Sequence, residues 1–424
     1  MEYMTLSHLY YKDKKGYESL YNQRFSSEST CILPIKIHDF DAFYCWCPEI
    51  YQLSSEIMQL DKKVAILCKD LPGAALEQFA SKCLLDEIKL TNDIEGVYST
   101  RKELAAVLDN LNKTDKKKRF YGLVKKYSLM TTEKFSLQSC SDIRQIYDEL
   151  VLPEIIEDCP ENAPDGTIFR KDRADVATAT QKVIHKGVYP ENKVIELMEK
   201  ALLILNDASI PILIRISLFH YFFGYIHPFY DGNGRTSRFI SSYLLSTEFE
   251  YLIGYRLSYT IKENIKQYYN AFQVCNDTKN KGDLTPFVIM FLTIINESFK
   301  NLYEALCKRM EALNKYYDII YDLSELSDEA EKEFCGVLLQ VALFSNRGIP
   351  KKGLCEVMGI SLSTVVKRLA KIRSLGLLKE LRGERAIMYT LDLDKLPELK
   401  HCRLGYPKRQ IERLTFRQVS LLFF

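Results

Sequence analysis

Apolar residues recur at helical spacing along most of the chain. Between Cys45 and Leu150 they lie three and four residues apart, which predicts helices joined by polar connections. The stretch 212–226 is apolar and aromatic on all sides, so it predicts a buried helix. Two short segments, 34–39 and 165–189, have extended, β-capable patterns instead. We therefore predict a mainly α-helical protein, with further helices over 76–91, 193–205, 261–272 and from 283 towards 323.

Residues 328–393 have a different pattern from the rest. They predict an apolar helix, a short helix, a basic helix over 361–373 and a hairpin that turns near Gly383, which is the order of a winged helix-turn-helix. Between residues 347 and 385 there are ten lysines and arginines but three glutamates, a local balance of +7 that is typical of nucleic-acid binding. A winged helix that contacts only proteins is the alternative. The DNA-binding candidates are Lys367, Arg368 and Lys371.

Composition narrows the class of protein. With 47% hydrophobic residues, 27% charged residues and a net charge of +2, the 424-residue chain has the character of a globular protein of two or three domains. Its twelve cysteines have no metal-binding spacing and no secretory signal pattern is present, so we expect reduced thiols and a cytoplasmic protein. The most apolar stretch, 210–229, contains Pro211, Arg215 and His220. We therefore expect a core helix rather than a membrane span, with His220 hydrogen-bonded inside it.

The segment HPFYDGNGRTSR, residues 227–238, gathers the residue types of phosphoryl chemistry between two predicted buried helices. His227 titrates near neutrality and can accept a proton from an attacking hydroxyl. Asp231 offers the carboxylate oxygen that Mg²⁺ (or Mn²⁺) prefers. The backbone N–H groups of the Gly-Asn-Gly turn, at the start of a helix, form a concave site for phosphate. The phosphate-binding candidates are Gly232, Asn233, Gly234, Arg235, Thr236, Ser237 and Arg238.

The same segment has features that a simple surface turn does not need. Arg235 and Arg238 are three residues apart, so on a helix they share a face and can both bind phosphate oxygens. Phe229 is predicted to turn inward and anchor the loop in the core. The alternative is a solvated turn with helix-capping charges. A base, a metal ligand, a glycine turn and two arginines placed together argue against it.

This segment resembles the signature of the Fic family, His-x-Phe-x-Asp/Glu-Gly-Asn-Gly/Lys-Arg, and matches it without a gap. Members of that family most often transfer AMP from ATP to a side-chain hydroxyl of a protein. The resemblance implies that His227 is the general base, that Asp231 is the magnesium ligand and that Arg238 holds the γ-phosphate. Related Doc-type kinases have lysine where this chain has Gly234, which favours nucleotidyl transfer here.

A second segment, Thr91-Asn-Asp-Ile-Glu95-Gly96, fits the inhibitory motif of the same family, Ser/Thr-x-x-x-Glu-Gly/Asn. Alone, the pattern could be a helix with one surface glutamate that ends at a capping glycine. Beside the full signature, the resemblance implies that Glu95 pairs with Arg238 and prevents the γ-phosphate from binding there. Because both residues belong to one chain, the inhibition would be intramolecular.

The resemblance also implies two less specific site elements. Tyr268, Tyr269 and Asn276 have a spacing that family members use around the adenine base, with core packing as the alternative for the tyrosines. A β-hairpin flap holds the target segment by strand addition. The chain has extra residues around 171–179 compared with the usual flap. The flap candidates are Lys182, Val183, Ile184 and His185.

We therefore expect a self-inhibited protein adenylyltransferase that uses ATP and a divalent metal ion to modify a tyrosine, serine or threonine hydroxyl of a target protein or of itself. Two alternatives stay open. One is a hydrolase that removes AMP from a modified protein, with Glu95 positioning the water, and the other is a nucleotide-sensing, DNA-binding regulator. The expected partners are ATP, a protein substrate, duplex DNA through the winged helix and a second copy of the chain, but no membrane.

The expected architecture is a Fic-type helical core with a small β-hairpin flap and a C-terminal winged helix-turn-helix domain. The predicted segments are an N-terminal helical region (1–140) that includes the inhibitory segment (91–96), the catalytic core (141–296), a linking helix (297–327), the winged helix-turn-helix (328–395) and a basic tail (396–424).

Overall fold

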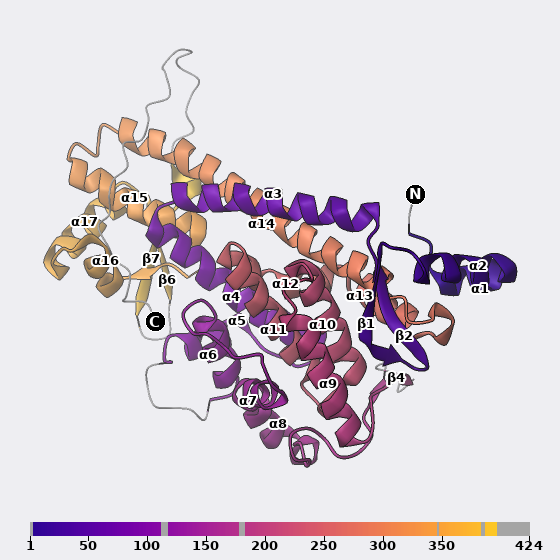
Figure 1. Ribbon diagram of the computed structural model, residues 1–424. Coiled ribbons are helices and arrows are strands. Elements are labelled where there is room, and N and C mark those ends of the chain that lie inside the picture. Colours follow the sequence, from indigo (N-terminus) through magenta and orange to yellow (C-terminus); the bar gives the residue numbers. More distant parts are fainter. Residues whose placement is uncertain (1–2, 112–117, 178–182, 346, 383–385, 397–424) are drawn as a thin grey trace. The chain divides into compact units, whose positions relative to one another are not determined.

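The computed structural model describes residues 3–111, 118–177, 183–345, 347–382 and 386–396 (Figure 1). These residues are mostly helical, as the apolar spacing predicts, with three small sheets. The chain forms two compact units, the first from Met1–Lys62 and Leu84–Leu302 and the second from Lys63–Cys83 and Tyr303–Phe424. Three long helices have residues in both units: α3 (Pro48–Asp70), α4 (Gly73–Ile94) and α14 (Thr285–Asp322).

The first forty residues contain two helices that the apolar pattern does not predict. Thr5 and Asp13 cap their N-termini through side-chain oxygens, but each helix buries a single residue, Leu6 in the first and Tyr17 in the second. With so little buried surface, no apolar periodicity is needed to form them. An antiparallel hairpin follows, and its first strand includes residues 34–37 of the predicted extended segment, while 38 and 39 form the turn. The elements are α1 (Leu6–Lys12), α2 (Lys14–Phe25), β1 (Thr30–Ile37) and β2 (Phe40–Cys45).

The centre of the first unit is the apolar helix α10 (Ile212–Ile226), which packs against α9, α11 and α13 (Figure 1). Twelve of its fifteen residues are buried, so it has no polar face. His220 lies inside this core and is hydrogen-bonded to Ser241 and Tyr268, as expected. The helices around it are α9 (Glu191–Asn206), α11 (Asn233–Glu248), α12 (Leu257–Glu263) and α13 (Ile265–Asn276).

Two smaller groups of elements complete the first unit. Four helices precede the flap: α5 (Arg101–Leu108), α6 (Tyr121–Leu129), α7 (Cys140–Leu150) and α8 (Leu152–Asp158). Two antiparallel strands, β3 (Asp175–Ala177) and β4 (Val183–Lys186), form a β-hairpin at the predicted flap. Of the flap candidates, Lys182 lies outside the described residues.

In the second unit, the C-terminal part of α14 is followed by a helix, a short strand, two helices and two strands. Tyr317 of α14 accepts a hydrogen bond from Gln340 of the next helix, at 2.6 Å. The segment after residue 348 starts as a strand rather than as the predicted helix, and the three strands pair in the order β5-β7-β6. The elements are α15 (Glu329–Phe344), β5 (Ile349–Pro350), α16 (Lys351–Met358), α17 (Leu362–Ser374), β6 (Leu378–Arg382) and β7 (Ile387–Leu391).

Among the described residues, no helix is both long and apolar enough to cross a membrane. Most of the basic tail, from residue 397 onward, lies outside the described part of the chain, as does the predicted turn at Gly383.

The tightest aromatic contact of the first unit joins α7 to the loop after α10. The rings of Tyr147 and Phe229 stack with centroids 3.6 Å apart at 9°, and Phe229 is fully buried, as predicted. Phe229→Ala removes this ring and leaves a cavity, so we expect the free energy of unfolding, measured in urea, to fall by about 3–5 kcal/mol.

Leu203→Ala on α9 is the control for this change, because its side chain is 67% exposed. It should alter the same free energy by less than about 0.5 kcal/mol. A loss for Phe229→Ala as small as that of the control would contradict the packing described here.

Candidate active site

The segment 227–238 connects α10 to α11 by a short, tightly held loop. His227 ends α10 in a left-handed conformation (φ 54°), and Gly232 begins α11 in another (φ 77°). The side chain of the buried Asn233 holds the loop from within: its Oδ1 accepts from the N–H of Phe229 (3.0 Å) and its Nδ2 donates to the carbonyl of Phe229 (2.7 Å). Asn233 therefore fixes the loop shape through its side chain, and the residues after it belong to the helix.

His227 is half-buried beside a buried arginine. Burial, followed by the positive charge of Arg170, lowers the pKa of His227 to about 3. The imidazole is therefore neutral around pH 7, the form that can accept a proton. Its own carbonyl accepts a hydrogen bond from Nε of Arg170 at 2.9 Å.

Arg170 joins the flap to the end of α10, and the sequence analysis assigned it no role. Its guanidinium is fully buried and donates to carbonyls of both segments: Val188 (2.8 Å), Ile226 (3.4 Å) and Asp172. Cations near a helix C-terminus satisfy the last carbonyls and the helix dipole. Gly187 allows this approach, because a Cβ there would lie 2.5 Å from Nη2 of Arg170. No spacing rule marks such a residue in advance.

The N-terminus of α11 presents backbone N–H groups next to an exposed carboxylate. The N–H of Gly232 donates to Oδ1 of Asp231 at 2.5 Å, so this carboxylate already occupies part of the predicted phosphate site. The first N–H groups of a helix have no acceptor within it, so those of Asn233 and Gly234, at the start of α11, are the ones that favour an anion. Asp231 is exposed, directly before this end. The hydroxyls of Thr236 and Ser237 donate instead to carbonyls of the same segment, those of Gly232 (2.9 Å) and Gly234 (3.1 Å). Their side chains are therefore satisfied inside the helix.

The two arginines of α11 have different partners. Arg235 donates from Nη1 to Oε2 of Glu154 on α8 at 3.0 Å, and both side chains are buried. Burial raises the pKa of Glu154 to about 7, against the opposing effect of Arg235. The sequence predicts a shared phosphate-facing side for Arg235 and Arg238 but does not reveal Glu154, which is 81 residues away from Arg235.

Arg238 is held by the end of α4. It is 1% exposed, and its Nε donates to Oγ1 of Thr91 at 2.8 Å while Nη2 donates to Oε1 of Glu95 at 2.6 Å. The predicted contact between Glu95 and Arg238 is therefore present. Nη2 also reaches the carbonyl of Thr91 at 3.2 Å. Two side chains of the Thr91–Gly96 segment thus occupy the guanidinium.

The carboxylate of Glu95 also covers the start of α11. A Cβ added to Gly234 would lie 2.1 Å from Oε1 of Glu95 and 3.0 Å from Nη1 of Arg238. The carboxylate is thus in direct contact with the helix turn whose N–H groups favour an anion. Glu95 follows the last residue of α4, and Gly96 ends the turn with φ 74°. The side chain of Glu95 is 28% exposed, so its carboxylate lies at one side of an accessible site.

A second glutamate of α4, Glu87, lies one helical turn before Thr91 and fully buried. Both of its oxygens accept from the N–H of Ser258 at 2.9 Å, and Oε1 lies 3.4 Å from the hydroxyl of Ser242. Burial raises the pKa of Glu87 to about 7. Glu87 therefore connects α4 to α11 and α12, and the sequence analysis missed it because a glutamate in an amphipathic helix ordinarily faces solvent.

The residues predicted around the nucleotide base differ in their exposure to solvent and in their hydrogen-bond partners. Tyr268 is buried and donates or accepts at Nε2 of His220 (2.7 Å), whereas Tyr269 is 42% exposed. Oδ1 of Asn276 accepts from the hydroxyl of Tyr221 at 2.7 Å. Tyr268 is thus packed in the core, and the contact of Tyr268, Tyr269 and Asn276 with the base stays a prediction.

Three of the flap candidates, Val183, Ile184 and His185, lie in β4, and the side chain of His185 contacts α10. Its Nε2 lies 2.6 Å from the carbonyl of Tyr225, and the two rings are 5.1 Å apart. The strand β4 is thereby fixed next to the last turn of α10, two residues before His227.

Residues 138–245 match the Fic/DOC family. Over 87 residues, the chain is 38% identical to a protein adenylyltransferase Fic from Drosophila grimshawi, covering 20% of this chain and 16% of that protein. It is 39% identical over 84 residues to the protein of that name from Aedes aegypti, covering 20% and 15%. The chain thus spans about a sixth of the length of these relatives. A Fic family protein from Desulfovibrio desulfuricans G20 has a similar fold (TM-score 0.50, 19% identity, 82% of this chain and 97% of that chain).

The buried carboxylate of Glu87 predicts a pH-dependent stability. A raised pKa in the folded state means that its contribution is complete below about pH 4.5 and is lost as the pH rises through about 7. Glu87→Gln keeps an acceptor for Ser258 but does not ionise. The variant should therefore gain stability over wild type between pH 4.5 and pH 8, by up to about 3 kcal/mol in urea unfolding.

Glu133→Gln is the control, since Glu133 is an exposed glutamate of the same unit. It should give a difference from wild type that does not change over this pH range. If the difference in unfolding free energy between Glu87→Gln and wild type were also constant, burial would not raise the pKa of this carboxyl group.

Proposed function

We propose that this chain, whose residues 138–245 match the Fic/DOC family, is a protein adenylyltransferase that inhibits itself through Glu95. One observation carries the proposal. A neutral imidazole and the free N-terminus of a helix meet at the same loop, and a carboxylate from a distant part of the chain lies on that helix terminus. The site is thus suited to bind an anion, and the carboxylate of Glu95 occupies part of the space that this anion would fill.

The proposed reaction transfers AMP from ATP to a hydroxyl of a protein. His227 accepts the proton of that hydroxyl, the oxygen forms a bond to the α-phosphorus, and the bond from this phosphorus to the pyrophosphate oxygen breaks. The N–H groups at the start of α11 bind the phosphates and stabilise the charge that develops on them. Arg170 keeps the imidazole in place by fixing its backbone carbonyl.

A divalent cation fits this site only together with the nucleotide. Among the described residues, no group of three or more histidines, cysteines or acidic residues could hold a metal by itself. Mg²⁺ is commonly held by one or two carboxylates plus phosphate oxygens. Asp231 supplies one exposed carboxylate next to the proposed phosphate site. A metal bound there would neutralise phosphate charge.

Self-inhibition follows from competition for Arg238. A buried guanidinium needs an anionic partner, and Glu95 provides it at 2.6 Å. A γ-phosphate reaching the same guanidinium must displace that carboxylate, which also contacts Gly234. ATP therefore binds in the productive position only when Glu95 moves away.

Replacing Glu95 tests both the activity and its inhibition. Glu95→Gly frees Arg238, so incorporation of label from ATP with a labelled α-phosphate should rise at least about tenfold over wild type. Adding Arg238→Ala should cancel the gain, because the γ-phosphate then loses its partner; the two changes are non-additive. Adding His227→Ala instead should reduce the label by about 10²–10⁴-fold.

Asp93→Gly is the matched control. Asp93 is another acidic residue near the end of α4, but it pairs with Lys89 and not with Arg238. It should leave labelling at the wild-type level. Equal labelling by wild type and Glu95→Gly would mean that Glu95 does not inhibit, and the absence of label in both would reject the transferase.

We also propose that residues 328–395 are a winged helix-turn-helix that binds duplex DNA through α17. Ser361 caps the N-terminus of α17, and Lys367 on this helix is exposed. The other two candidates are less available: Lys371 lies 3.4 Å from Glu331, and Arg368 lies over the ring of Phe334. Lys367 is therefore the candidate that would contribute most.

Charge reversal on α17 tests this second proposal. Lys367→Glu with Arg368→Glu should weaken duplex binding in gel shifts and reduce the slope of log affinity against log salt by about two. The matched control is Lys308→Glu with Lys315→Glu on α14, which should leave binding unchanged. If wild type shows no affinity at low salt, the domain is a protein-contact module.

A further inference from the structure

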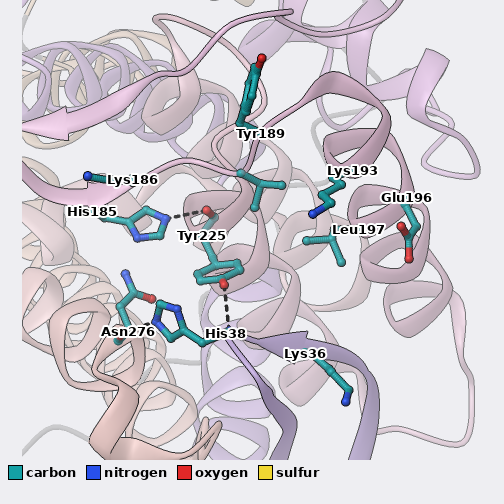
Figure 2. A pocket seen from close by; sticks show the side chains of 11 residues that line it. Lys36, His38, His185, Lys186, Tyr189, Lys193, Glu196, Leu197, Tyr225 and Asn276 are labelled. Carbon is teal, nitrogen blue, oxygen red and sulfur yellow. Dashed lines mark hydrogen bonds between the residues drawn. The ribbon is translucent and has the colours of Figure 1, made fainter.

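An open pocket of about 770 Å³ lies next to the flap, outside the loop and helix turn of the candidate active site. Its walls come from three separate elements: the hairpin β1–β2 with its turn, the strand β4 and the helix α9 (Figure 2). Tyr225 and Asn276 lie between them. The charged and titratable residues of the lining are Lys36, His38, His185, Lys186, Lys193 and Glu196.

The charge of this pocket is positive. Glu196 is the acidic residue among those that line it, and its carboxylate pairs with Lys200, one turn along α9, at 2.7 Å. Lys186 and Lys193 are exposed and form no ion pair with any other described residue. Figure 2 shows Lys193 extending from α9 towards the middle of the pocket. Lys36 is 3.8 Å from Asp41, and both side chains are largely exposed. Lysines placed this way attract a negatively charged partner.

The two imidazoles of the pocket are fixed by the backbone. His38 contacts the carbonyl of Asn276 through Nε2 at 2.8 Å, and His185 contacts the carbonyl of Tyr225 in the same way. His38 holds a left-handed conformation (φ 54°) at the turn of the β1–β2 hairpin. The N–H of His38 also donates to the hydroxyl of Tyr225 at 3.3 Å. The hairpin and the flap strand are therefore both connected to α10 at the floor of the pocket, and the hairpin also to α13, which gives the pocket a defined shape.

The pocket is also close to the reacting groups along the chain. Tyr225 on its floor is two residues before His227, and the N–H of Val188 in its wall donates to the carbonyl of Ile226 at 3.1 Å. The pocket therefore lies beside the end of α10 that His227 terminates. An extended peptide can add to strand β4, with its side chains placed by the surrounding walls.

We propose that this pocket docks an acidic segment of the protein that supplies the hydroxyl, with Lys186 and Lys193 as the main contacts. The proposal rests on the proposed function, since it names the class of target for that reaction. The pocket selects a hydroxyl that has aspartate or glutamate nearby in its sequence. Lysine-rich segments are rejected, because like charges in close contact repel.

Binding can be measured without any reaction. A fluorescent random copolymer of glutamate and tyrosine is titrated with the full chain in the absence of ATP, and anisotropy is read at several salt concentrations. We expect Lys186→Glu with Lys193→Glu to weaken binding roughly tenfold. A lysine–tyrosine copolymer should bind the wild-type protein weakly and the variant better.

The matched control changes the same net charge elsewhere on the first unit: Lys12→Glu with Lys134→Glu, both exposed. It should leave the copolymer affinity unchanged. An equal loss of affinity in the control would show that copolymer binding depends only on the net charge of the protein. Unchanged affinity in the pocket variant would show that the copolymer binds elsewhere. Either result overturns the proposal.

The reaction gives a second, independent readout. In a Glu95→Gly background, the pocket variant should raise the KM for the glutamate–tyrosine copolymer roughly tenfold, while kcat and the KM for ATP stay the same. A raised KM for ATP would assign the pocket to the nucleotide, whose base is predicted to contact Asn276, and would overturn the docking proposal. Charge-dependent copolymer binding without any labelling would instead reject the transferase and keep the docking site.

Discussion

A buried positive charge sets the main constraint on this structure. Arg238 is almost inaccessible to water, and a guanidinium in that position is costly unless an anion and hydrogen-bond acceptors surround it. In the observed state Glu95 and Thr91 supply them. The same requirement can be met by a phosphate, so the site has two alternative ways to satisfy one charge. In the proposed function, inhibition by Glu95 and binding of the γ-phosphate therefore satisfy the same buried charge.

This constraint explains why a glycine stands at position 234. Oε1 of Glu95 would lie only 2.1 Å from a Cβ at this position, so any larger residue would push the carboxylate away from Arg238. Glycine at the start of α11 therefore serves both arrangements. It lets the carboxylate approach in the observed arrangement and, in the proposed nucleotide-bound one, leaves the backbone N–H groups open to phosphate. Glu87, one turn before Thr91, holds the rest of α4 against α11 and α12, which keeps Glu95 within reach.

Local pattern was sufficient for the parts of the site that lie close together in sequence. The buried helix α10 and the inward turn of Phe229 were predictable from it. The pairing of Glu95 with Arg238, which are 143 residues apart, was predictable only by resemblance. Glu154, Glu87 and Arg170 were not predictable, because each is a buried polar residue defined by partners distant in sequence. The N-terminal helices were missed for the opposite reason: they bury too little to have an apolar period.

Arg170 connects the position of the flap to the chemistry of the base. The same guanidinium that holds Val188 and Asp172 of the flap region lies against His227 and, together with burial, keeps its pKa far below neutrality. An imidazole with so low a pKa is neutral but is a weak base. In the proposed reaction, negative charge comes next to it from a triphosphate at the start of α11 or from an acidic segment along β4, which favours the protonated form and raises that pKa. Proton removal by His227, as proposed, is therefore linked to the binding of both substrates.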